Sequence, residues 1–439
     1  MTVLAAAAPQ DPLLAPTPPM GWNSWDSYGL TVNQQEFEAN ASYMAENLRQ
    51  HGWQYAVVDE GWYLQNPEAK PGSFRFTMDA YGRFTPAASR FPSAAATGDG
   101  FAALAQWTHA HHLLFGIHII RGIPREAVAR NLPIAGSKFH AADAAEKTDT
   151  CAWNADNYGV AANAAGQAYY ESLAALYASW GVDFVKIDCI SSPYKGDEIR
   201  MFSEALRQTT RPIVLSLSPG PTPMDKIIDL RKYAQMWRIS GDVWDHWGQW
   251  PGQTWSQGVL AQFEMAAKWA PLVETGHWPD ADMLPIGFLG PRPGQGKARQ
   301  SALTPDESRT LVTLWSIFRS PMIIGGNLTQ IDSGTRALLT NDEVIAVDQH
   351  SYGGRQVMND SQKIVWVAHG EHSGSAYVAL FNVADTGQTI TFPLQSLGLA
   401  SVSFAARDLW EHKDVGVTDR IQVALRPHAS ALYKVTVQK

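Results

Sequence analysis

Acidic side chains follow several short apolar runs of the sequence. The run YAVVDE (55–60) ends in Asp59 and Glu60, and VDFVKIDC (182–189) contains Lys186 and Asp188. Because side chains alternate along a strand, Lys186 and Asp188 would face the same way. Hydrolysis of a glycosidic bond needs two carboxyl groups that flank the bond, one as nucleophile or base and one as acid. Paired acids at strand ends therefore raise the hypothesis of such chemistry.

Further polar and aromatic residues occur at equivalent places. Asp242 follows Arg238 by four residues, and HWPDADML (277–284) carries Asp280 and Asp282. A single Asp more often caps a helix or lies in a solvated loop, but acids after this many runs favour a shared site. Carboxylates accept hydrogen bonds from sugar hydroxyls, and sugar rings pack on aromatic rings. The set, which also includes Trp22, Trp25 and His118, suits a neutral polyhydroxylated ligand.

Neighbouring charges suggest roles for two of these acids. The cation of Lys186 would keep Asp188 ionised, as a nucleophile requires. Asp242, which follows Gly241 at a strand exit, is the better candidate for a proton donor. From the pattern alone, other pairings of the carboxylates stay open.

The elements that must position these residues are short apolar runs that alternate with helical patterns. The runs lack period-2 alternation, as expected of parallel strands buried on both faces. They are residues 20–25, 55–60, 114–120, 182–189, 212–218, 234–240, a weak run around 270–284, and 321–326. Between them, a helix should begin at a capping box of Thr31 and Gln34, and another should end at Gly181. Eight such repeats predict a (β/α)8 TIM barrel, with a doubly wound sheet as the alternative.

The pattern changes after about residue 345. Six β-rich runs separated by turn residues, between 363 and 437, predict an antiparallel β-sandwich. NDEVIAVDQ (341–349) would connect the two parts. We therefore expect a flexible N-terminal arm (1–16), a catalytic barrel (17–345) and a C-terminal antiparallel β domain (346–439).

Composition limits the partners. The net charge of −8 argues against nucleic acid and anionic membrane surfaces, and no apolar run reaches the length of a membrane span. The start, MTVLAAAAPQDPLLAPTPP, is not an intact signal peptide but resembles what trimming after one would leave. We expect a secreted or periplasmic protein that acts on a small-molecule, oligosaccharide or polysaccharide glycoside. The oligomeric state stays open, with a homodimer among the alternatives.

At this point the motifs resemble a known family. PPMGWNSW, YAVVDEGW, FGIHI, VDFVKIDC, MWRISGDVWD and HWPDADMLPIG occur in the order seen in glycoside hydrolase family 27, the melibiase-like α-galactosidases. The resemblance covers about residues 17–439. It implies a retaining exo-glycosidase that needs no metal or cofactor. Asp188 matches the family's nucleophile, and Asp242 matches its acid/base.

The resemblance also assigns the surrounding residues. Those that match sugar-binding positions are Trp25, Asp59, Lys186, Arg238 and Asp282, while His118 stands where many relatives carry Tyr. Cys151 and Cys189 resemble a pair that bridges two loops at the barrel mouth. The fifth run ends in Ser216-Leu217-Ser218-Pro219-Gly220, where well-known relatives have a Glu/Trp loop near the sugar's 2-position. The preference at C2, including for 2-acetamido sugars, therefore stays open.

The main departure from the family is Glu60, where relatives usually carry Asp. Glu is one methylene longer and would crowd the C6 arm of galactose. β-L-Arabinopyranose is α-D-galactopyranose without that arm, and relatives that cleave arabinopyranosides also depart from Asp here. The sequence predicts an α-galactosidase, with a β-L-arabinopyranosidase as the close alternative. A non-catalytic sugar-binding barrel is a remote alternative, because both catalytic acids are present.

Overall fold

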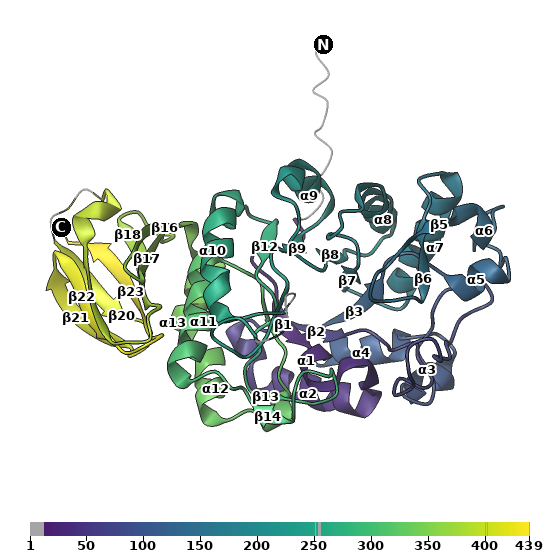
Figure 1. Ribbon diagram of the computed structural model, residues 1–439, viewed down its shortest axis with the longest axis horizontal. Coiled ribbons are helices and arrows are strands. Elements are labelled where there is room, and N and C mark those ends of the chain that lie inside the picture. Colours follow the sequence, from purple (N-terminus) through teal and green to yellow (C-terminus); the bar gives the residue numbers. More distant parts are fainter. Residues whose placement is uncertain (1–12, 251, 253–255, 400, 402, 439) are drawn as a thin grey trace, which may run out of the picture.

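Eight parallel strands form a closed barrel, as the sequence predicted (Figure 1). The computed structural model describes residues 13–250, 252, 256–399, 401 and 403–438. The barrel strands, in sheet order, are β12 (Trp278–Asp280), β9 (Met236–Arg238), β8 (Val214–Leu217), β7 (Phe184–Asp188), β3 (Leu114–Ile120), β2 (Tyr55–Val58), β1 (Met20–Asn23) and β15 (Met322–Ile324). A parallel bridge between Leu284 and Ile324 closes the ring next to β12. All eight predicted runs are therefore barrel strands.

The end of the barrel away from the catalytic groups is filled by apolar side chains. The cluster there includes Val57, Phe184 and Trp278, together with Ala15 from the N-terminal segment. The indole nitrogen of Trp278 donates a hydrogen bond to the Ala15 carbonyl at 2.9 Å. Ala15 and the half-buried Leu14 thus pack against the barrel although the sequence placed them in a flexible arm, whereas Leu13 and Pro16 are exposed. The rest of that arm, residues 1–12, lies outside the described residues.

Helices surround the barrel and connect its strands. Those before β7 are α1 (Trp25–Tyr28), α2 (Gln34–Asn47), α3 (Pro92–Thr97), α4 (Ala102–Ala110), α5 (Arg125–Ala129), α6 (Ala141–Ala144) and α7 (Ala164–Ser179). Those after it are α8 (Gly196–Gln208), α9 (Ile227–Tyr233), α10 (Val259–Trp269), α11 (Pro305–Phe318), α12 (Ser333–Leu339) and α13 (Asp342–His350). The expected connector, 341–349, is therefore mostly a helix, which Asn341 caps through the backbone amides of Glu343 and Val344.

The start of α2 corrects one sequence prediction. Its capping box is formed by Asn33 and Glu36, not by Thr31 and Gln34. The Thr31 hydroxyl instead donates a hydrogen bond to the Tyr28 carbonyl, so Thr31 belongs to a preceding 3₁₀ turn. Asn33 has the extended backbone that an N-cap requires. At the other predicted boundary, α7 ends just before Gly181, whose φ is +81°.

A small antiparallel sheet is inserted between β3 and β7. Its strands are β4 (Ile123–Pro124), β5 (Ala145–Thr150) and β6 (Asn157–Val160), in the order β4-β6-β5. The loop 151–156 joins β5 to β6 and reaches the catalytic end of the barrel. Two further pairs of two-residue strands lie in the barrel part of the chain: β10 (Asp242–Val243) with β11 (Ser256–Gln257), and β13 (Phe288–Leu289) with β14 (Arg299–Gln300).

The C-terminal part is an antiparallel β-sandwich beside the barrel (Figure 1). One sheet has the order β16-β17-β18-β23-β20-β21, and a second contains β19 and β22. Their bounds are β16 (Tyr352–Asp360), β17 (Lys363–His369), β18 (Ser375–Asn382), β19 (Gln388–Pro393), β20 (Phe404–Asp408), β21 (Lys413–Thr418), β22 (Arg420–Leu425) and β23 (Ser430–Val437). The six predicted runs are all strands here, while β16 and β21 were not predicted. No helix among the described residues is long and apolar enough to cross a membrane.

Candidate active site

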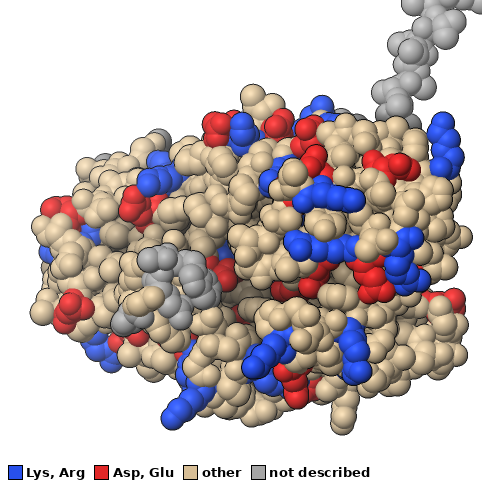
Figure 2. All heavy atoms as spheres, turned by 45° about the vertical axis from the view of Figure 1, so that its right-hand side comes forward, with Lys and Arg blue, Asp and Glu red and all other residues tan. Residues whose placement is uncertain are grey.

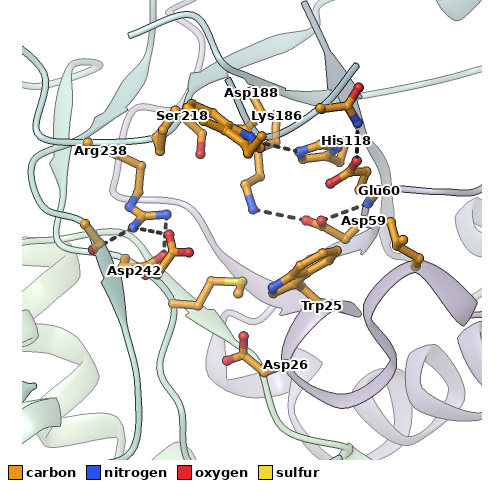
Figure 3. A pocket seen from close by; sticks show the side chains of 18 of the residues that line it. Trp25, Asp26, Asp59, Glu60, His118, Lys186, Asp188, Ser218, Arg238 and Asp242 are labelled. Atoms are coloured by element: carbon orange, nitrogen blue, oxygen red, sulfur yellow. Dashed lines mark hydrogen bonds and ion pairs between the residues drawn. The ribbon is translucent and has the colours of Figure 1, made fainter. Parts of the chain in front are cut away.

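A cavity of about 710 Å³ lies at the carboxyl ends of the barrel strands. In such barrels this end carries the catalytic groups. Its polar lining comes from the ends of seven barrel strands and the loops that follow them, and Figure 3 shows the labelled side chains pointing toward one another. The space-filling view shows the molecule hollowed on one face, with acidic side chains visible inside the hollow (Figure 2). The predicted residues that line the cavity are Trp25, Asp59, Glu60, His118, Lys186, Asp188, Arg238, Asp242 and Asp282.

Asp59 is held rigidly at the end of β2. Its Oδ2 accepts hydrogen bonds from Asn23 Nδ2 at 2.7 Å and from Lys186 Nζ at 3.1 Å. Burial raises the pKa of Asp59, but the cations of His118 and Lys186 outweigh this effect and hold the pKa below its ordinary value. Asp59 is therefore a fixed carboxylate that can accept hydrogen bonds from hydroxyl groups.

Asp188 lies at the end of β7, next to two donors. Trp153 Nε1 donates a hydrogen bond to its Oδ2 at 3.2 Å, and His118 Nε2 lies 3.9 Å from the same oxygen. Burial raises the pKa of Asp188, but His118 and then Lys186 lower it, and the net pKa is below its usual range. The pKa of His118 is raised: burial lowers it, but the Asp59 and Asp188 carboxylates raise it further. This environment maintains the charged carboxylate that a nucleophile needs.

Arg238 joins the two acids on the opposite side of the cavity. Its Nη2 lies 3.1 Å from Asp242 Oδ1, and its Nη1 lies 2.8 Å from Asp282 Oδ1. The Asp242 side chain is 40% exposed, whereas that of Asp282 is 5% exposed. Burial raises the pKa of Asp282, although Arg238 opposes this effect. Asp242 is thus the acid of this pair that solvent and a leaving group can reach, as a proton donor requires.

Glu60 follows Asp59 and contacts an inserted loop. Asn154 Nδ2 donates a hydrogen bond to Glu60 Oε1 at 2.7 Å. Burial raises the pKa of Glu60 to about 7, an effect that the nearby carboxylates of Asp188 and Asp59 increase and that His118 opposes. Ionising the Glu60 carboxyl group therefore costs more free energy in the folded protein than in the unfolded chain.

This cost predicts a pH-dependent effect of Glu60→Gln. The folded-state pKa lies above the ordinary value of 4.5, so the folded protein keeps a proton that the unfolded chain has lost. The contribution of Glu60 to the free energy of unfolding of the wild type should therefore fall as pH rises from about 4.5 to 7. The full destabilisation should persist above that range. Gln carries no charge, so the variant should gain about 3 kcal/mol over wild type at pH 8 relative to pH 4.5.

Thermal unfolding of both proteins at the two pH values measures this gain. Glu68→Gln, which changes an exposed carboxylate eight residues away, is the matched control and should follow wild type. A difference in Tm between Glu60→Gln and wild type that is the same at both pH values would contradict the prediction.

Ser216 was also predicted to bind substrate, but it lies below the cavity. It is a buried residue of β8, paired with Lys186 in the sheet, and it is not among the residues that line the cavity. Ser218, two residues nearer the mouth, lines the cavity instead. Because side chains alternate along a strand, both serines share a face, but only the later one is at the depth of the cavity.

Two residues next to the predicted site were not predicted from the sequence: Asn23, which supports it from behind, and Asp26, which lines the cavity. Asn23 holds Asp59 and accepts a hydrogen bond from the Trp25 backbone amide at 2.8 Å. Asp26 is 2% exposed, and its Oδ2 has no hydrogen-bond partner among the described residues. Burial, and then Asp282, raise the pKa of Asp26 well above its usual range. Both residues lie in the GWNSWD segment, so proximity to Trp25 was the signal that could have found them.

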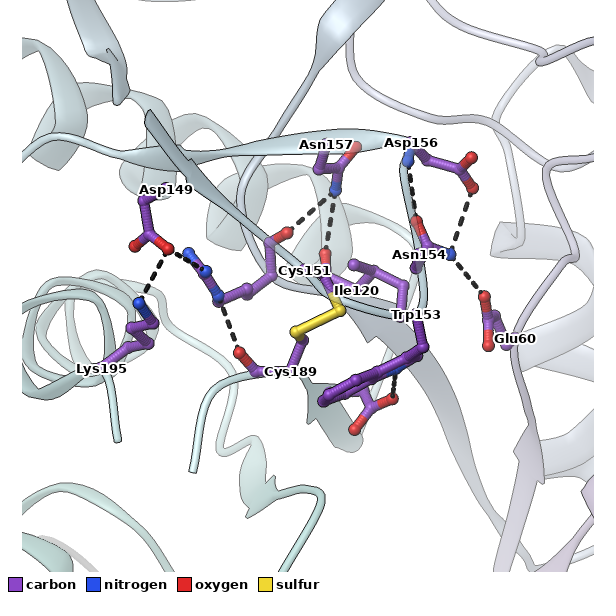
Figure 4. Close-up of a disulfide and its surroundings, with 12 residues drawn as sticks. Glu60, Ile120, Asp149, Cys151, Trp153, Asn154, Asp156, Asn157, Cys189 and Lys195 are labelled. Atoms are coloured by element: carbon purple, nitrogen blue, oxygen red, sulfur yellow. Dashed lines mark hydrogen bonds and ion pairs between the residues drawn. A yellow bond between two sulfur atoms is a disulfide. The ribbon is translucent and has the colours of Figure 1, made fainter. Parts of the chain in front are cut away.

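A disulfide anchors the inserted loop beside Asp188. Cys151 at the start of the loop is bonded to Cys189, which directly follows Asp188 (Figure 4). The next residues of the loop, Trp153 and Asn154, contact Asp188 and Glu60. Sequence spacing gave no sign of these contacts, because 35 residues separate Trp153 from Asp188 and 94 separate Asn154 from Glu60.

Comparisons with known proteins match both parts of the chain. The profile of the family described as alpha galactosidase A matches residues 154–350, and that of the alpha galactosidase C-terminal beta sandwich domain matches residues 360–435. An alpha-galactosidase from Oryza sativa subsp. japonica is 27% identical over 96% of this chain and 85% of its own. One from Coffea arabica is 29% identical over 96% of this chain and 94% of its own.

The chain is also similar to solved structures. The crystal structure of a family-27 β-L-arabinopyranosidase from Geobacillus stearothermophilus is 45% identical, with a TM-score of 0.90 over 96% of this chain and 97% of the other. A variant of that enzyme in complex with arabinose is 44% identical, also with a TM-score of 0.90, over 97% and 98% of the two chains. With this identity over nearly the whole of both chains, the protein belongs to glycoside hydrolase family 27, and it is a glycoside hydrolase that acts on a carbohydrate substrate.

Proposed function

We propose that the enzyme is a retaining exo-glycosidase that releases terminal β-L-arabinopyranose. The observation that carries this proposal is the position of Glu60, whose carboxyl group lines the cavity next to Asp59 and is held there by Asn154. β-L-Arabinopyranose and α-D-galactopyranose present the same ring hydroxyls, and only galactose carries the C6 hydroxymethyl arm. A carboxyl group one methylene longer than the family's usual Asp would occupy the space of that arm.

The first step of the proposed mechanism transfers the sugar to the enzyme. The Asp188 carboxylate attacks the anomeric carbon while the bond from that carbon to the leaving oxygen breaks. Asp242 gives its proton to the leaving oxygen, so the aglycone departs as a neutral alcohol. His118 and Lys186 support the ionised state of Asp188 before attack, and Asp59 and Asp282 are positioned to accept hydrogen bonds from ring hydroxyls.

The second step returns the free enzyme. Asp242, now a carboxylate, removes a proton from a water molecule as the water oxygen attacks the anomeric carbon. The ester bond to Asp188 breaks, and its electron pair returns to the carboxylate. Two inversions at the same carbon give a sugar with its original anomeric configuration, and both acids regain their starting protonation states.

Hydrolysis of terminal α-D-galactosides is the second candidate. The relatives from rice and coffee are named alpha-galactosidases, and they align with this chain over 96% of its length. Both sugars would present the same ring hydroxyls to the polar groups of the cavity. The choice between the two substrates therefore depends on the space beside Glu60.

The experiment that tests the proposal is the Glu60→Asp substitution. Shortening the side chain frees room for a hydroxymethyl group, and one methylene in a pocket typically changes discrimination by about 10- to 200-fold. We expect the substitution to lower the ratio of kcat/KM for p-nitrophenyl β-L-arabinopyranoside over p-nitrophenyl α-D-galactopyranoside by a factor within this range. Glu68→Asp, the same change at an exposed position, should leave the ratio unchanged. A ratio that Glu60→Asp does not alter would refute the role given to Glu60.

We also propose that the enzyme works in an oxidising compartment, as a secreted or periplasmic protein. The disulfide between Cys151 and Cys189 supports this location, because such bonds persist mainly outside reducing compartments.

A further inference from the structure

The loop 151–156 contains the donor that contacts the Glu60 carboxyl group. Asn154 Nδ2 lies 2.7 Å from Glu60 Oε1, and no other side chain among the described residues donates to this carboxyl group. Without a donor, a Glu side chain could adopt other rotamers and open the space beside it. The position of Glu60 therefore depends on a residue that is not part of the barrel strands.

The Asn154 side chain is itself fixed in one orientation. Its Oδ1 accepts a hydrogen bond from the Asp156 backbone amide at 2.8 Å, which forces Nδ2 to face the carboxyl groups of Glu60 and Asp156. The amide cannot be flipped without losing these bonds. Tyr63 continues the network by donating to Asp156 Oδ2 at 3.3 Å, and its ring is stacked on Phe84 with centroids 4.1 Å apart.

Both ends of the loop are anchored, the first to the residue after β7 and the second to the start of α5. The disulfide joins Cys151 to Cys189 at the first end. At the second end, the Arg125 backbone amide donates to the Asp156 carbonyl at 3.0 Å. Figure 4 shows the disulfide and, farther along the loop, Asn154 with its amide group directed at Glu60. A loop held at both ends can keep one side chain at a defined distance from the cavity.

From this geometry we propose that Asn154 is a specificity-determining positioning residue. It acts through Glu60, by holding that carboxyl group in the space where the C6 arm of a hexose would lie. The sugar preference is thus set by a pair of residues, one at the end of β2 and one in the inserted loop. Which sugar Asn154 favours rests on the proposed function. That Asn154 acts on the sugar preference only through Glu60 does not.

A double-mutant cycle tests the proposal. The proteins are wild type, Asn154→Ala, Glu60→Ala and the double variant, and the readout is the ratio of kcat/KM for the arabinopyranoside over the galactopyranoside. From the net free-energy contribution of one hydrogen bond, we expect Asn154→Ala to lower this ratio roughly 3- to 10-fold in the wild-type background. In the Glu60→Ala background the same substitution should leave the ratio unchanged, because the group it positions is absent.

Two further variants separate positioning from loop folding. Asn154→Ser keeps a side-chain oxygen that can accept from the Asp156 amide but is too short to reach Glu60, so it should lower the ratio as Asn154→Ala does. Asn163→Ala is the matched control, because Asn163 also makes two side-chain bonds, to the Asp143 carbonyl and from the Gly166 amide, but does not line the cavity. It should leave the ratio unchanged.

The outcomes distinguish this inference from the proposed function. If Asn154→Ala lowers kcat/KM for both sugars by the same factor, or changes the ratio equally with and without Glu60, the positioning role is overturned. If wild type prefers the galactoside but Asn154→Ala changes the ratio only when Glu60 is present, the positioning role stands and the proposed sugar is wrong.

Discussion

Replacing Asp188 by Asn is expected to abolish turnover of every glycoside that the enzyme accepts. Asn has nearly the same shape and can still accept the hydrogen bond from Trp153, but it cannot form the ester with the anomeric carbon. Losses for removal of a covalent nucleophile reach about 10⁶-fold, and we expect kcat to fall on the order of 10⁵-fold, or about 7 kcal/mol.

The loss should be independent of the leaving group, because no substrate can bypass the missing nucleophile. Steady-state rates with aryl and alkyl glycosides measure this, and sugar binding by the inactive variant shows that the site is intact. Asp197→Asn, at an exposed position on α8, is the control and should retain full activity. A protein with Asp188→Asn that keeps more than about one-hundredth of wild-type kcat would contradict the nucleophile assignment.

Asp242→Asn is expected to have the second largest effect, and its size should depend on the leaving group. The amide can still accept a hydrogen bond from Arg238 but has no proton to donate. General acid catalysis contributes about 10²- to 10⁴-fold, so alkyl glycosides should lose that much in kcat/KM. Dinitrophenyl glycosides leave without protonation and should lose far less in the first step.

The same variant should then accumulate the glycosyl-enzyme, because the second step lacks its base. Rapid-mixing experiments with a dinitrophenyl glycoside should show a burst of dinitrophenol followed by slow turnover. An equal loss for dinitrophenyl and alkyl leaving groups, with no burst, would assign the proton donor to another residue. Asp282 would then be the first alternative, since it contacts the same guanidinium.

The sequence predicted the barrel because its signal is local and repeated. Each of the eight runs is a short, mainly apolar stretch between helical patterns, and each contains a barrel strand. The strands β16 and β21 were missed because they form the two edges of their sheet. Their side chains are mostly exposed, and both contain glycine, so neither run resembles a buried strand.

The site residues that lie at the ends of barrel strands could be predicted from the sequence. Asp59, Lys186 and Asp188 follow directly from the rule that barrel strands carry their functional groups at the carboxyl end. Trp153 and Asn154 could not be found in this way. They belong to a loop between two short antiparallel strands, and only the folded chain brings that loop to β2 and β7.

The sequence also could not predict how near to the cavity a residue lies along its strand. Ser216 and Ser218 share a face of β8, and alternation alone does not indicate which of them reaches the cavity. The register of β8 with β7 sets this depth, because Ser216 lies beside Lys186 while Ser218 lies beyond the end of the paired segment. Sheet register depends on contacts between distant segments, which a single sequence does not reveal.

The measurement that tests the proposed function most directly is the substrate preference of the unmodified enzyme. It is the ratio of kcat/KM for p-nitrophenyl β-L-arabinopyranoside over p-nitrophenyl α-D-galactopyranoside, taken with both substrates at the same pH. With Glu60 held in the space of the C6 arm, we predict a ratio of about 10 or more in favour of the arabinopyranoside. A ratio below one would contradict the proposal and establish the enzyme as an α-galactosidase.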